Sequence, residues 1–267
     1  MNSFKKTIAA SALLLAFAIA GAVAEDAARA VAPTGALRVA IAVGPAASTF
    51  WATRDPQSGE PRGVTVELGK AAAEKLHVPL KLVAYKNSGE IAAAASKSEW
   101  DISFMPADAE REKYVDQGPS YVVYESSYLV RGGAGIKDMA DVDRTGIHVG
   151  VIEGTATSRT VAKSLKNAWL ATYAKPEMAA ASMRDGNLDA LAMGRDALAD
   201  LAKTLPGSRV LDGAVQSTGV VVAVPKNRAA TRDWAAHFVE DAKADGTVRH
   251  AFDSSGFATT EVAPAGR

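Results

Sequence analysis

The chain has 267 residues, with 30 Lys and Arg against 30 Asp and Glu, and it contains no cysteine. This length suffices for one large domain or two modest ones. The balanced charge, without a long basic run, argues against nucleic acid or anionic lipid as a partner. The lack of cysteine excludes disulfides, cysteine nucleophiles and cysteine–metal sites.

The first residues have the pattern of a secretory signal peptide. Lys5 and Lys6 are followed by the apolar stretch 9–20 and by the small-residue cleavage pattern Ala22-Val23-Ala24. The apolar stretch is shorter than the roughly 20 residues that a membrane-spanning helix needs. We therefore predict a signal peptide over residues 1–24, cleaved after Ala24. Because no cysteine is available for lipidation, we expect a soluble protein in the periplasm.

Strand and helix signals alternate after a predicted linker over residues 25–35. The first set consists of strand Leu37–Ala42, helix Gly63–Leu76, strand Pro79–Tyr85, helix Glu90–Ser98 and strand Ile102–Met105. This βαβαβ order predicts a parallel sheet covered by helices.

A second alternating set begins after Val130. It consists of helix Ile136–Val142, strand His148–Ile152, helix Thr157–Leu165, strand Ala171–Ala174, helix Lys175–Asp185, strand Leu188–Ala192, helix Asp196–Thr204 and strand Val210–Leu211. A strand Val220–Val224 and a helix Ala229–Asp245, stopped by Gly246, complete the chain. Two α/β sets joined by extended segments predict two lobes.

The stretch Trp100–Tyr121 carries the main candidate site. Its buried strand stops at Pro106, and the charged run Asp108–Arg111 follows. Charged groups at the carboxyl end of a buried strand are where open α/β sheets place their ligand sites. The guanidinium of Arg111 can hold a carboxylate in two parallel hydrogen bonds. The alternative is that Arg111 is a solvated surface arginine, paired with Asp108 or Glu110.

Five motifs in order resemble one protein family. They are Gly63–Leu68 (GVTVEL), Asp101–Tyr121, Val149–Thr157 (VGVIEGTAT), Gly186–Ala190 (GNLDA) and Val239–Val248 (VEDAKADGTV). With them the chain resembles the type II periplasmic binding proteins, over nearly all of residues 36–257. More narrowly, it is similar to solute-binding family 3, which includes glutamine- and basic-amino-acid-binding components of ABC importers.

The resemblance implies an α/β fold of two lobes, each a mostly parallel sheet flanked by helices. The first lobe would comprise residues 36–125 with 220–267, and the second residues 127–216. Two extended hinge strands, near Glu125–Tyr128 and Gln216–Gly219, would let the lobes close over a ligand. It also implies a monomer that serves an inner-membrane ABC permease and needs no cofactor.

The resemblance implies that groups from both lobes bind the carboxylate of the ligand. Arg111 matches the arginine that binds the ligand's carboxylate in the family. A helix start in the second lobe would offer backbone N–H groups to the same anion; it consists of Gly154, Thr155, Ala156 and Thr157. The alternative is that this start is an ordinary turn and N-cap.

Further ligand contacts are expected from the cleft walls. Five residues would form an apolar wall: Phe50, Trp51, Met105, Pro106 and Met193. Trp51 could instead serve only lobe packing. On the crossover side, Glu125 is expected to face the cleft.

The departures from the family bear on the ligand. Gly194 stands where amino-acid binders carry an aspartate for the α-ammonium, and Asp196, two residues on, is disfavoured by strand alternation. Pro106 and Ala107 stand where glutamine binders carry hydroxyl donors. Since an unpaired buried ammonium is costly, we predict a carboxylate ligand that need not be an α-amino acid. A small organic acid, an aromatic acid or a modified amino acid would fit.

Two other functions remain open at this stage. Cyclohexadienyl dehydratases share the implied fold, and Glu153 or Glu125 could serve as the acid that such an enzyme adds. The protein could also be a ligand-sensing partner of a membrane receptor. The four histidines are dispersed without metal-site spacing, so we expect neither a metal site nor an enzyme.

Overall fold

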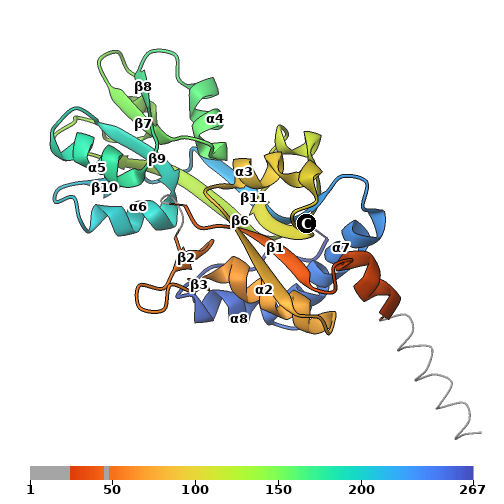
Figure 1. Ribbon diagram of the computed structural model, residues 1–267. Helices are drawn as coiled ribbons and strands as arrows, with labels where there is room; N and C mark the ends of the chain where they lie inside the picture. The colour runs from red at the N-terminus through yellow and green to blue at the C-terminus, as the bar shows by residue number, and fades with distance from the viewer. Residues whose placement is uncertain (1–24, 45–47, 267) are drawn as a thin grey trace, which may run out of the picture.

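The computed structural model describes residues 25–44 and 48–266. The predicted signal peptide lies outside the described residues. The first α/β set is formed by β1 (Leu37–Ala42), the hairpin β2 (Thr53–Arg54) and β3 (Pro61–Arg62), α2 (Val64–Lys75), β4 (Leu80–Tyr85), α3 (Ser88–Ala93), the 3-10 turn η1 (Ala95–Lys97) and β5 (Ile102–Pro106). Two C-terminal helices, α7 (Ala229–Ala244) and α8 (Thr247–Ser254), pack against this set (Figure 1).

The second set gathers at the other end of the molecule (Figure 1). It is formed by the 3-10 turn η3 (Met139–Val142), β7 (His148–Ile152), α4 (Ala156–Ser164), β8 (Trp169–Tyr173), α5 (Pro176–Arg184), β9 (Ala190–Gly194), α6 (Arg195–Ala202) and β10 (Arg209–Val210). The helix expected over Ile136–Val142 is reduced to this one 3-10 turn, which Asp138 begins with a capping box.

Two long strands connect the sets. β6 (Val115–Val130) and β11 (Gln216–Pro225) pair antiparallel with each other, and β6 continues to pair with β9. The sheet order is β4-β1-β5-β11-β6-β9-β7-β8, with parallel pairs at both ends and antiparallel pairs in the middle. Register shifts in β11 interrupt its ladder with β6 near Val221, where a strand bends most readily.

The buried side chains form separate cores on the two sides of these strands. One large core takes residues from 31–122 and 220–252, and a smaller one lies beside it. Two others take residues from 128–211 and 129–205. We call the parts that hold these two pairs of cores the first lobe and the second lobe. The hinge positions stay a prediction.

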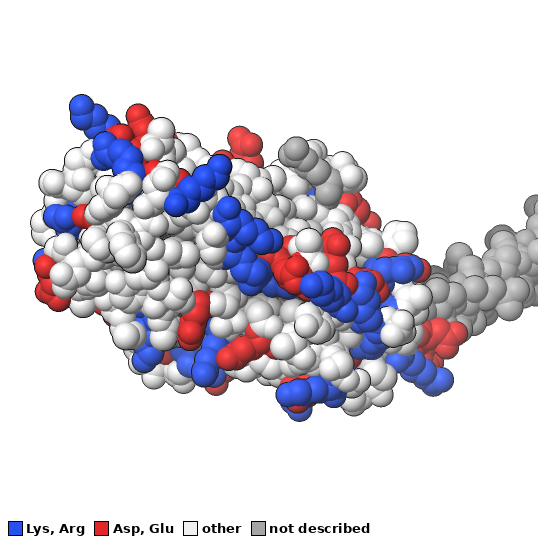
Figure 2. Space-filling model, turned by 90° about the horizontal axis from the view of Figure 1, so that it is seen from above, with Lys and Arg blue, Asp and Glu red and all other residues white. Residues whose placement is uncertain are grey.

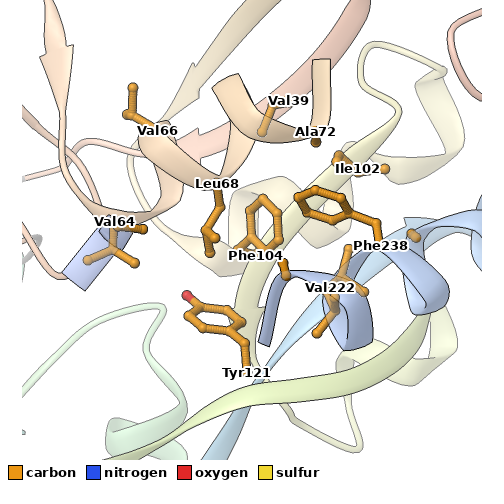
Figure 3. Close-up of a cluster of buried hydrophobic side chains, with 14 of the residues drawn as sticks. Val39, Val64, Val66, Leu68, Ala72, Ile102, Phe104, Tyr121, Val222 and Phe238 are labelled. Carbon is orange, nitrogen blue, oxygen red and sulfur yellow. The ribbon is translucent and has the colours of Figure 1, made fainter. Parts of the chain in front are cut away.

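The large core of the first lobe is drawn in Figure 3. Leu68 from α2, Phe104 from β5 and Tyr121 from β6 gather in its centre, and all three are buried. These strands are apolar because both faces are covered: α2, α7 and α8 pack on the large core, and α3 and η1 pack on the smaller one.

Two helices near the ends of the described chain were not predicted. The segment predicted as a linker is helical over residues 25–31, and Val31 and Ala32 are buried in the first lobe. Arg228 ties this helix down by donating to the carbonyl of Val31 at 3.0 Å. The alanine-rich composition favours a helix. The helix α8 after Gly246 was also not expected.

The surface carries both signs of charge. In Figure 2, Lys and Arg side chains lie beside Asp and Glu, and large parts of the visible face are uncharged. Among residues 25–44 and 48–266, no helix is both long and apolar enough to cross a membrane.

Candidate functional site

A cavity of about 90 Å³ lies where four strands end, two from each lobe. Strand ends contribute Ala42, Phe104, Pro106, Ile152, Met193 and Gly194 to its lining. Two helix starts contribute Lys86, Asn87 and Ser88 before and within α3, and Thr155, Ala156 and Thr157 at α4. The connecting strands contribute Tyr124, Ser126, Gln216 and Thr218, and a loop contributes Trp51. This is the edge of the sheet at which open α/β folds bind ligands.

Seven of the predicted site residues line this cavity, namely Trp51, Pro106, Thr155, Ala156, Thr157, Met193 and Gly194. Arg111 and Gly154 do not line it, but Arg111 donates to the carbonyl of the lining residue Pro106, and Gly154 precedes the lining residue Thr155. Phe50, Met105 and Glu125 lie elsewhere.

Arg111 is not a solvated surface arginine. It begins the 3-10 turn η2 (Arg111–Lys113), and only 3% of its surface is exposed. Its Nη1 donates to the carbonyl of Pro106 at 2.8 Å, while Nε and Nη2 are buried without an acceptor among the described residues. Burial lowers the pKa of Arg111 to about 10, with a contribution from Arg159, so the group is cationic at neutral pH. A buried cation with two unused donors is a strong anion-binding group.

Asp108 lies between two arginines. Its Oδ1 accepts the backbone N–H of Arg111 at 3.3 Å, and its Oδ2 is 2.6 Å from Nη2 of Arg159, on α4 of the second lobe. Burial alone would raise the pKa of Asp108, but the hydrogen bond from Arg159 and the charge of Arg111 hold it below its usual value. The carboxyl of Asp108 is therefore ionised at neutral pH, as the guanidinium of Arg111 is protonated.

The start of α4 faces the cavity. Thr155 is its N-cap: the hydroxyl accepts from the backbone N–H of Ser158 at 3.1 Å. The preceding Gly154 has a φ of 72°, and a Cβ there would lie 2.5 Å from Nδ2 of Asn87 in the first lobe. A glycine is therefore needed for the two lobes to approach this closely.

Ten lining residues were not predicted, and strand alternation could have found four of them, namely Tyr124, Ser126, Gln216 and Thr218. Tyr124 is opposite Thr218, and Ser126 is opposite Gln216, so all four lie on one face of the β6–β11 pair. Glu125 lies between them and therefore points to the other face. Its expected position in the cleft is wrong: it is exposed and pairs with Arg195 at 3.3 Å.

Phe50 and Met105 also do not touch the cavity. Phe50 is 3% exposed and packs in the first-lobe core, with its ring 4.7 Å from that of Tyr124 and 5.9 Å from that of Phe252. Met105 is fully buried in the smaller core of the same lobe. Met105 follows the lining residue Phe104 in β5 and therefore points to the opposite side of the sheet. Phe50 lies in the loop beside Trp51 and contacts its ring, with the ring centroids 5.2 Å apart.

Comparison with known proteins agrees with this architecture. Residues 39–254 match the family described as bacterial extracellular solute-binding proteins, family 3. A glutamine-binding protein of Geobacillus stearothermophilus is 27% identical over 170 residues, which are 60% of this chain and 62% of that protein. The chain thus spans about three fifths of the length of that relative.

Solved structures share the fold. An ancestral amino acid-binding protein, a precursor of cyclohexadienyl dehydratase, superposes with a TM-score of 0.73 at 24% identity, covering 85% of this chain and 98% of that one. A putative ABC transporter binding component from Wolinella succinogenes, complexed with lysine, gives 0.73 at 23% identity, covering 82% and 95%. These likenesses confirm the predicted type II periplasmic binding protein fold. The match over residues 39–254 shows that the chain belongs to the bacterial extracellular solute-binding proteins, family 3.

Proposed function

We propose that this protein is the periplasmic substrate-binding component of an ABC importer and captures a small carboxylate-bearing solute between its two lobes. Family membership supports the solute-binding part of this proposal. The solved relatives include proteins bound to lysine and to arginine, so amino acids belong among the solutes to be tested.

One observation carries the proposal: the guanidinium of Arg111 is buried with its Nε and Nη2 unpaired among the described residues. A buried cation with two of its three donor nitrogens unpaired is costly for the protein. A carboxylate ligand would supply the missing acceptor and would be held in charge-assisted hydrogen bonds.

The second lobe would act on the same anion. The N-terminus of α4 supports this role, because Ala156 and Thr157 line the cavity and their N–H groups lie at the positive end of a nine-residue helix. Arg111 and α4 belong to different lobes, so one anion held by both would favour closure of the hinge.

A thermal-shift screen of amino acids, organic acids and aromatic acids tests the proposal. A solute at 100 times its dissociation constant stabilises the native state by about 2.7 kcal/mol. We expect at least one carboxylate to raise the melting temperature of the wild-type protein but not that of Arg111→Met. Lys113→Met is the matched control, because Lys113 is in the same turn but is exposed. An undiminished shift with Arg111→Met would contradict the proposed site.

Neither of the two glutamates considered as a catalytic acid lies in the cavity. Glu153 is exposed, Glu125 is exposed and paired with Arg195, and neither lines the cavity. The family is one of solute-binding proteins, in agreement with the expectation that this chain is not an enzyme.

The sensing alternative uses the same ligand capture and differs only in the partner. Uptake of the bound solute by a strain that lacks this protein distinguishes the two. We expect uptake to be lost, whereas intact uptake with a lost transcriptional response would favour sensing.

A further inference from the structure

The cavity wall beside Gly194 is made by a phenol. Gly194 ends β9, and a Cβ at this position would lie 1.5 Å from Oη and 2.3 Å from Cζ of Tyr124. No side chain can therefore stand at Gly194 while Tyr124 keeps its place. The glycine and the tyrosine form one unit of the wall, because β9 and the strand of Tyr124 are paired neighbours.

The carboxylate nearest to this wall is already engaged. The hydroxyl of Tyr124 donates to Oδ1 of Asp196 at 2.5 Å, and the hydroxyl of Ser48 donates to Oδ2. Burial, and then the negative charge of Asp196, raise the pKa of Tyr124 well above its ordinary value, so the phenol stays a donor. Asp196 lies behind the tyrosine and does not line the cavity.

Several polar side chains of the wall are hydrogen-bonded within the protein. Ser126 and Thr157 share a hydrogen bond of 2.8 Å between their hydroxyls, and the hydroxyl of Thr218 donates to the carbonyl of Ala107 at 3.1 Å. The side-chain oxygen of Gln216 accepts from Thr160 at 2.7 Å. These oxygens are neutral acceptors and cannot neutralise a ligand cation.

Three basic and three acidic side chains lie around the cavity, and the acidic ones, Asp108, Glu90 and Asp196, each have a partner. Lys86 lines it, and Arg111 and Arg159 lie behind Pro106 with Asp108 between them. The lining itself contains no Asp or Glu among the described residues. Lys86 has one acidic neighbour, Glu90 at 4.0 Å, which is exposed. A ligand ammonium in this cavity would be desolvated without a carboxylate in the lining to pair with it, which disfavours its binding.

We propose that the cavity selects carboxylic acids that carry no α-ammonium group. The carboxylate would face Arg111 and the start of α4, and an apolar body would lie between Trp51, Phe104, Ile152 and Met193. This inference rests on the proposed function, since it concerns the ligand of the same site.

Calorimetric titration with matched pairs tests it, because the members of each pair differ only in the ammonium. The pairs are 4-methylpentanoate and leucine, 3-phenylpropanoate and phenylalanine, and pentanedioate and glutamate. We expect the better-fitting acid to bind at least about 100-fold more tightly than its amino counterpart, the ratio expected for an unpaired buried charge.

The outcomes separate the two proposals. An amino acid that binds as tightly as its acid, or more tightly, would overturn this inference and leave the proposed function intact. Failure of both members of every pair to bind would overturn the inference and count against the proposed carboxylate capture as well.

A pair of variants locates the selectivity. Gly194→Asp combined with Tyr124→Ala clears the phenol and adds a carboxylate to the wall, so we expect the preference for the acid to fall at least about 10-fold. Tyr124→Ala alone is the control: it opens the same space and removes the same hydrogen bond to Asp196, so the difference between the two variants measures the effect of the added carboxylate. Circular dichroism and the melting temperature establish that both variants fold. An unchanged preference in the folded double variant would show that this wall does not set the selectivity.

Discussion

The carboxylate of Asp108 lies 2.6 Å from Nη2 of Arg159, and this ion pair joins the loop after β5 in the first lobe to helix α4 in the second. Both side chains are partly buried, with 12% and 31% of their surfaces exposed. The pair therefore belongs to the arrangement in which the lobes lie together. Its strength bears on how readily they separate.

We expect Arg159→Gln to weaken the closed arrangement. A partly exposed ion pair contributes at most about 1 kcal/mol, so the dissociation constant of a captured solute should rise about 2- to 5-fold. Titration gives the constant, and small-angle X-ray scattering should show a larger radius of gyration of the ligand-free variant. Arg184→Gln, at the exposed end of α5, is the control. Equal affinities and equal radii for Arg159→Gln and wild type would mean that the pair does not influence closure.

Asp101 forms buried ion pairs with two arginines of the first lobe, Arg38 and Arg228. Its carboxylate is fully buried and accepts from Arg38 Nη2 at 2.8 Å and from Arg228 Nη1 at 2.7 Å. Removing one partner of a buried ionic network typically costs about 3–5 kcal/mol. We expect Asp101→Asn to lower the free energy of unfolding in urea by this amount at pH 7.

The pH dependence of this loss follows from the pKa of Asp101. Burial alone would raise it, but the hydrogen bonds from Arg38 and Arg228 outweigh burial and lower it. The stabilisation is therefore complete above the ordinary carboxyl value of about 4 and disappears as the pH falls through the lower folded value. The difference between wild type and Asp101→Asn should be constant from about pH 5 to 8 and shrink below about pH 4. Asp116→Asn, which breaks the more exposed pair with Lys226, should change stability by less than about 1 kcal/mol. A difference that grows on acidification would refute the assignment.

Much of the fold could be predicted because its signals are local. Apolar strands, amphipathic helices and five ordered motifs determine the alternation of elements, and most boundaries differ from the structure by a few residues. The helix over residues 25–31 was missed because short alanine-rich segments have no hydrophobic periodicity to distinguish them from a linker.

The site was harder to predict because it depends on contacts between distant residues. Arg111 could be proposed from its motif, but its burial depends on neighbours from both lobes. The partner of Asp108 is 51 residues away, and no local pattern indicates it. The contact of Tyr124 with Gly194 requires the register of β6 against β9. Strand alternation could have predicted Tyr124 in place of Glu125, together with the other lining residues on the same face of β6 and β11.

The hydroxyl of Tyr121 is buried in the first-lobe core without a partner among the described residues. Figure 3 shows it pointing into a group of aliphatic side chains that includes Leu68 and Val64. An unpaired buried hydroxyl carries a desolvation penalty, so Tyr121→Phe should stabilise the protein by about 1 kcal/mol. Chemical denaturation measures the change. Tyr85→Phe is the comparison, because its hydroxyl donates to Glu99 at 2.9 Å and its loss should not stabilise. A destabilised Tyr121→Phe would indicate that the hydroxyl has a partner in solution.

Gly63 fixes the loop that carries Trp51 into the cavity. Its φ is 137°, and a Cβ there would lie 2.6 Å from the carbonyl oxygen of Trp51 and 2.7 Å from that of Thr49. These carbonyls accept from the first residues of α2, so they cannot move away without breaking hydrogen bonds. Gly63→Ala should therefore cost at least about 2 kcal/mol and also weaken solute binding. Gly59→Ala is the matched control: it has a positive φ of 74° but open space around it, so only the conformational cost of about 1 kcal/mol applies. Equal losses in the two variants, or normal binding by Gly63→Ala, would show that the backbone contact does not hold Trp51 in place.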